Sequence, residues 1–115
     1  MEGNFINIDF KKIEEMVEDD LVFRNQLLDA IEIAVEELEG AYIKGIGEEN
    51  LECIKQARHK IKPTLSLFGL KRLTNILSIG KKKLAEDGFV NDMDAHVKEF
   101  KECTQSVLLE VRNYR

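Results

Sequence analysis

His59 and Lys62 are the two side chains whose types and spacing could together carry out a chemical step. On a helix they lie about one turn apart, and His59 projects about 140° away from the apolar face that starts at Ile54. An exposed neutral imidazole offers a nitrogen lone pair to an electrophile, and a nearby ammonium group stabilises phosphoryl charge as it arrives. The pair therefore indicates phosphoryl transfer to His59, with an exposed histidine of no chemical role as the alternative.

The charge around this pair is strongly one-sided. Residues 55–83 hold nine lysines and arginines and no acidic residue, whereas the rest of the chain holds eight basic residues and all 22 acidic ones. A local positive surface on a protein of net charge -5 indicates an anionic target, such as a phosphoryl group or an acidic pocket on a partner. The other interpretation, equally open from charge alone, is that these cations form a solvated face and pair with acidic helices nearby.

Apolar residues recur at three- and four-residue steps along five segments, as expected for amphipathic helices. The segments are 5–17, 20–47, 50–69, 70–88 and 91–111, with Asp19 or Asp20 as the cap of the second. No segment alternates apolar and polar residues for long enough to predict a strand. Because the four longer helices can bury their apolar faces against one another, we expect an all-α fold in one domain covering 1–115. Its predicted architecture is an antiparallel four-helix bundle with a short additional N-terminal helix.

Several classes of protein are excluded or disfavoured. No glycine-rich phosphate loop follows a strand, which argues against an autonomous kinase or nucleotide-hydrolysing domain. No apolar run approaches the ~20 residues that span a bilayer, and no signal peptide is visible, so we expect a cytoplasmic protein without membrane insertion. Cys53 and Cys103 match no metal-ligand spacing, so we expect no metal and place both in the core or at its boundary. We expect a structural role for His96.

Residues 57–70, ARHKIKPTLSLFGL, resemble the signature of histidine-containing phosphotransfer (HPt) domains. That signature has a small residue two positions before the phosphorylated histidine. A basic or polar residue, an aliphatic residue, a lysine and usually a glycine follow the histidine, and a second glycine comes six residues later. His59, Lys60, Ile61, Lys62 and Gly69 match. The resemblance extends to the whole chain, because HPt domains are acidic four-helix bundles of this length with a short leading helix.

The resemblance implies that His59 accepts a phosphoryl group from a phospho-aspartate on a response-regulator receiver domain and passes it to another receiver. Lys62 would hold the phosphoryl oxygens. The protein would be a monomeric intermediate of a two-component phosphorelay fed by a hybrid sensor histidine kinase, with no kinase activity of its own. It would need no cofactor, since the receiver supplies the Mg²⁺.

Receiver contacts are expected from exposed residues around the histidine. The charged and polar candidates lie on the same helix, and the apolar candidates lie at its end. They are Lys55, Arg58, Lys60, Pro63, Ser66, Leu67 and Leu70.

Pro63 departs from the signature, which usually has glycine there. Proline adds bulk and removes the N–H that would bond to the carbonyl of His59, so we expect a local kink. One interpretation is a variant with adapted receivers. The other is a degenerate module, which leads to an alternative function: a non-catalytic helical adaptor that binds a receiver or another acidic partner without phosphotransfer. A nucleic-acid binder using residues 55–83 is disfavoured by the acidic remainder of the chain.

Overall fold

The computed structural model describes residues 7–90 and 93–115, and within them all regular structure is helical. The elements in chain order are α1 (Phe10–Val17), α2 (Leu21–Gly47), α3 (Leu51–Leu67), α4 (Lys71–Asp87), a 3-10 turn η2 (Gly88–Val90) and α5 (Asp94–Tyr114). The expectation of an all-α fold is therefore confirmed for the described residues. The predicted starts of the first and fifth helices, at 5 and at 91–92, lie outside them.

Side-chain caps explain where three of the helices begin. Asp9 accepts a hydrogen bond from the backbone N–H of Lys12, which starts α1. Asp20 and Asn50 do the same for α2 and α3, each accepting from the N–H three residues later. These side chains satisfy N–H groups that have no partner inside the helix. The prediction that an aspartate at 19 or 20 caps the second helix is confirmed, with Asp20 as the cap.

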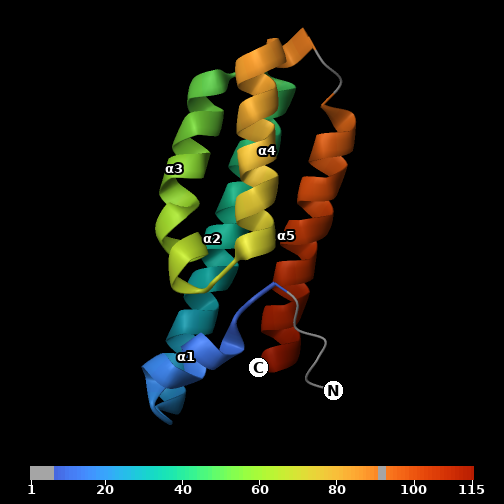
Figure 1. Ribbon diagram of the computed structural model, residues 1–115. Coiled ribbons are helices and arrows are strands. Elements are labelled where there is room, and N and C mark those ends of the chain that lie inside the picture. The colour runs from blue at the N-terminus through green and yellow to red at the C-terminus, as the bar shows by residue number, and fades with distance from the viewer. Residues whose placement is uncertain (1–6, 91–92) are drawn as a thin grey trace.

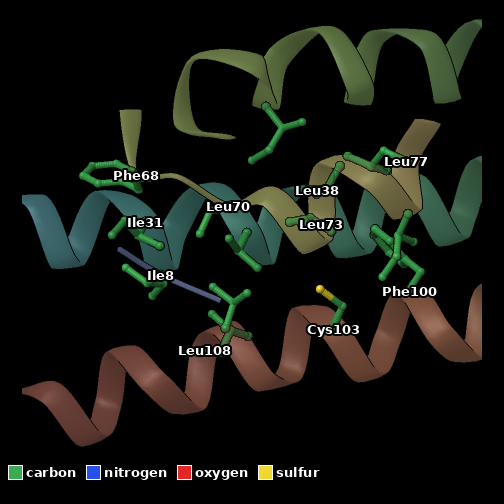
Figure 2. Close-up of a cluster of buried hydrophobic side chains, with 14 of the residues drawn as sticks. Ile8, Ile31, Leu38, Phe68, Leu70, Leu73, Leu77, Phe100, Cys103 and Leu108 are labelled. Carbon is green, nitrogen blue, oxygen red and sulfur yellow. The ribbon is translucent and has the colours of Figure 1, made fainter. Parts of the chain in front are cut away.

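The helices share one apolar core, and Figure 1 shows how they are arranged around it. Helix α2 contacts α1, α3 and α5, while α4 contacts α3 and α5. Each of the five helices contributes buried apolar side chains, and Figure 2 shows part of this cluster. The described chain measures 49 × 26 × 18 Å along its principal axes. Because α3 and α4 are neighbours, residues on both can line one surface.

The connection between α3 and α4 corrects one prediction. Leu70 was expected near the exposed face, but it is 0% exposed and lies among the buried side chains in Figure 2. The reason is that α3 ends at Leu67 and the chain turns at Gly69, whose φ is +65°. The helical rotation that placed Leu70 outward therefore does not continue to that residue. A side chain at 69 would also meet Asp9 Cβ at 3.1 Å, so glycine suits both the turn and the close approach.

Among the described residues, no helix combines the length and the apolar character required to cross a membrane.

Candidate functional site

His59 lies on α3 with its side chain exposed, and Lys62 is exposed one turn further along. Both belong to a groove between α3 and α4, which we call the histidine groove. The nine residues that line it come from these two helices alone: Lys55, Arg58, His59, Lys62, Leu65, Thr74, Leu77, Ser78 and Lys81. Its cavity volume is about 380 Å³. The predicted pair thus shares an open surface that a second protein can reach.

The histidine groove is cationic. Lys55, Arg58 and Lys62 come from α3 and Lys81 from α4, and no described residue that lines the groove is acidic. Among the described residues, the basic residues of 55–83 form one ion pair, in which Lys60 Nζ lies 3.2 Å from Glu37 Oε1. The interpretation that these cations pair with acidic helices therefore holds for Lys60 and not for the groove. An incoming anion therefore meets four cations that form no ion pair with a carboxylate of the described residues.

Arg58 connects the groove to the core. Its side chain is half-buried, and its Nη1 atom is buried with no hydrogen-bond partner among the described residues. A buried N–H without an acceptor is costly, so this atom is a polar group that the fold leaves unsatisfied at the base of the groove. The positive charge of Arg58 also affects the buried Tyr42. Burial raises the pKa of Tyr42 to about 12, and the guanidinium charge opposes that rise.

Pro63 is exposed, and α3 continues through it to Leu67. The proline ring has no N–H, so it cannot donate to the carbonyl of His59 one turn earlier. Because both residues are on the exposed side, water can bond to that carbonyl instead. The fold thus accommodates the proline beside the histidine.

The remaining predicted contact residues are divided between surfaces. Ser66 and Leu67 are exposed near the end of α3, and Leu67 is 46% exposed. Lys60 lies on the α2 side of the helix, where it pairs with Glu37. Leu70 is buried, so the prediction that it is a docking contact is wrong.

Besides the apolar Leu65 and Leu77, three residues of the groove were not predicted as site residues: Thr74, Ser78 and Lys81 on α4. Their i, i+4, i+7 spacing places two hydroxyl groups and an ammonium group on one face of that helix. This spacing was available in the sequence. The missing information was that this face of α4 lies against the His59 face of α3.

His96 and the two cysteines lie away from the groove. His96 is 3% exposed, and its Nε2 lies 2.8 Å from the Tyr42 hydroxyl. Burial lowers the pKa of His96, the charge of Lys83 lowers it further, and Glu99 opposes both. Cys103 is buried and Cys53 half-buried, as expected. No group of three or more potential metal ligands occurs among the described residues.

Comparison with protein-family models, with curated proteins and with solved structures found no match for this chain. A function proposed for this chain therefore rests on the sequence signature at 57–70 and on the residues of the histidine groove.

Proposed function

We propose that this protein is a phosphorelay intermediate of the HPt type, in which His59 carries the phosphoryl group. The observation that supports this most directly is the exposed imidazole in a groove that, among the described residues, is lined by four cationic side chains and no acidic one. The five helices are compatible with the antiparallel four-helix bundle of that family, α1 being the additional short helix. We place the role in the cytoplasm and take the protein as a monomer.

In the proposed step, a neutral His59 nitrogen attacks the phosphorus of a phospho-aspartate on a receiver domain. The N–P bond forms as the P–O bond breaks, the aspartate carboxylate leaves with the electron pair, and the N–H proton of the charged ring passes to solvent. Lys62 stabilises the transferred oxygens, and the receiver provides Mg²⁺ and the acidic pocket. Transfer to a second receiver is the reverse of this step, so no nucleotide site is needed.

The direct test is phosphotransfer from a panel of phosphorylated receiver domains, including one from a hybrid sensor histidine kinase. We expect an acid-labile, alkali-stable phosphoprotein that His59→Gln abolishes. Label that persists in this variant would refute the assignment.

The role of Lys62 is tested separately. Lys62→Ala should slow transfer about fivefold to tenfold, since an exposed ammonium contributes about 1 kcal/mol. Lys98→Ala, which removes an exposed lysine on α5, is the matched control and should leave the rate unchanged. Equal rates for the two variants would remove Lys62 from the mechanism.

Pro63 favours a second candidate function, a non-catalytic adaptor. A proline one turn after His59 adds bulk where the receiver must approach, while the cationic groove still offers an acidic partner a surface. Receiver binding without phosphoryl exchange across the whole panel would select the adaptor over the relay.

A further inference from the structure

The histidine groove continues past Lys62 into a second hollow. The two share Lys62, Leu65 and Thr74, so they form one continuous depression along the line between α3 and α4. In Figure 1 these two helices lie side by side, and α1 lies at the end of the helix bundle where α3 ends and α4 begins. The second hollow extends to this end, since Lys12 of α1 lines it. We call the two depressions together the basic trough.

The second hollow is also cationic. Lys12 from α1, Lys62 from α3 and Lys71 from α4 line it, with polar groups from Ser66 and Asn75 between them. The described residues that line it include no acidic side chain, and one carboxylate, that of Asp9, lies beside Gly69 at its edge. Three helices thus place ammonium groups around one depression, which extends the positive surface well beyond His59.

The position of Lys12 is fixed by tertiary contacts. Its Nζ donates to the backbone carbonyl of Ser66 at 3.3 Å. The backbone N–H of Asp9 donates to the carbonyl of Phe68 at 3.1 Å, and Gly69 allows the close approach of Asp9. These contacts hold the start of α1 against the end of α3, so Lys12 is part of the trough in the folded protein.

The size of the trough indicates its occupant. From Lys55 to Ser66, α3 rises about 16 Å, which is the length of about five residues of extended peptide. A single phosphate ion is too small to reach both ends. We propose that the basic trough binds an acidic peptide segment of the partner protein, alongside the contact at His59.

This proposal rests on the proposed function only for the identity of the partner. Binding of an acidic segment at the trough would favour partners that carry one, and it would speed their association at low salt. The trough would then contribute to partner choice, whereas His59 and Lys62 contribute to transfer.

The test is a titration of the ¹⁵N-labelled protein with a capped pentaglutamate peptide at low salt, followed by amide chemical shifts. We expect shifts at Lys12, Ser66, Gly69 and Lys71 that weaken as salt is added. The double variant Lys12→Ala, Lys71→Ala should bind the peptide about threefold to tenfold more weakly, because it loses two exposed charge pairs that are each weak in water.

The matched control is Lys98→Ala, Lys101→Ala, because these exposed lysines share a hollow on α5 with Asp94 and Glu102. It should bind the peptide as the native protein does. Equal weakening in both double variants, or no shifts in the trough, would overturn the proposal. The same shifts produced by inorganic phosphate at matched ionic strength would also overturn it, because the trough would then be a small-anion site only.

The His59→Gln variant separates the two functional claims. It should keep most of the peptide affinity, because the lysines of the second hollow and the cations of the groove remain, while it fails to accept phosphate. If the native protein binds the peptide but never transfers phosphate, the relay function is refuted and the peptide-binding proposal stands. If it transfers phosphate but does not bind the peptide, only the peptide-binding proposal is refuted.

Discussion

Replacing Glu110 with alanine should release the N-terminal segment from the rest of the protein. Glu110 lies on α5, is 6% exposed, and accepts hydrogen bonds at both carboxylate oxygens. Its Oε1 accepts from the backbone N–H groups of Asn7 and Ile8 at 3.1 and 3.0 Å. Its Oε2 accepts from the side-chain amide of Asn7 at 2.8 Å. One carboxylate thus holds the segment that leads into α1.

The expected cost follows from the donors that would be left without an acceptor. Asn7 is 4% exposed and Ile8 is also 4% exposed, so water cannot easily replace the lost carboxylate. Each unsatisfied buried donor costs about 1–3 kcal/mol, and such costs add incompletely. We therefore expect Glu110→Ala to lower the free energy of unfolding by about 3–5 kcal/mol. Part of that loss will appear as detachment of α1, because the same segment positions this helix.

Glu110→Gln is the more selective variant. Its carbonyl can keep the two backbone N–H bonds, while its amide group faces the donor of Asn7, so we expect a smaller cost of about 1–2 kcal/mol. Urea unfolding gives the free energies, and amide hydrogen exchange in α1 reports detachment. Glu102→Ala, an exposed position on the same helix, is the control. A cost below about 1 kcal/mol for Glu110→Ala, no larger than that of the control, would refute the reasoning.

Three further perturbations test other parts of the structure. Gly80→Ala should lower the free energy of unfolding by about 1–3 kcal/mol, because a Cβ would collide with His96 and the Tyr42 hydroxyl; an unchanged urea midpoint would contradict this. Burial lowers the pKa of folded His96, so stability should fall as the pH drops below about 6.5, where the unfolded chain gains the proton. His96→Gln should reduce the difference in the free energy of unfolding between pH 7.5 and 5.5. If the variant and the native protein lose the same free energy over this range, His96 is not the cause. Pro63→Ala should stabilise the exposed side of α3 by about 1–3 kcal/mol, and a lower melting temperature would argue against this.

The sequence was sufficient for features that depend on one helix. The sequence placed the cap of α2 at Asp19 or Asp20 and the start of α3 near Asn50, because a cap acts within three residues of itself and periodicity begins there. The exposure of His59 and Lys62 followed from rotation about a single axis. The prediction for Leu70 was wrong because it extended that rotation across the turn at Gly69, where the axis changes direction.

Features that join distant parts of the chain could not be predicted in this way. Asn7 and Glu110 are 103 residues apart, and neither belongs to a motif that pairs them. Glu110 lies beside Val107 and Val111, so periodicity alone places a carboxylate at the edge of an apolar face and gives no reason for its burial. The contact that places Lys12 in the basic trough could not be predicted for the same reason, because it joins α1 to the distant end of α3.

The histidine groove itself depends on how closely α4 approaches the core. Gly80 lies against Tyr42 and His96 at a position where a side chain would collide with both. The absence of a side chain lets α4 lie near these residues, and its neighbouring residues Ser78 and Lys81 then face the groove. A buried glycine contact thus helps to set the position of Lys81, the one groove cation on α4, relative to His59. The Gly80→Ala variant should therefore alter the groove even where the protein remains folded, which links the packing of the core to the chemistry proposed at its surface.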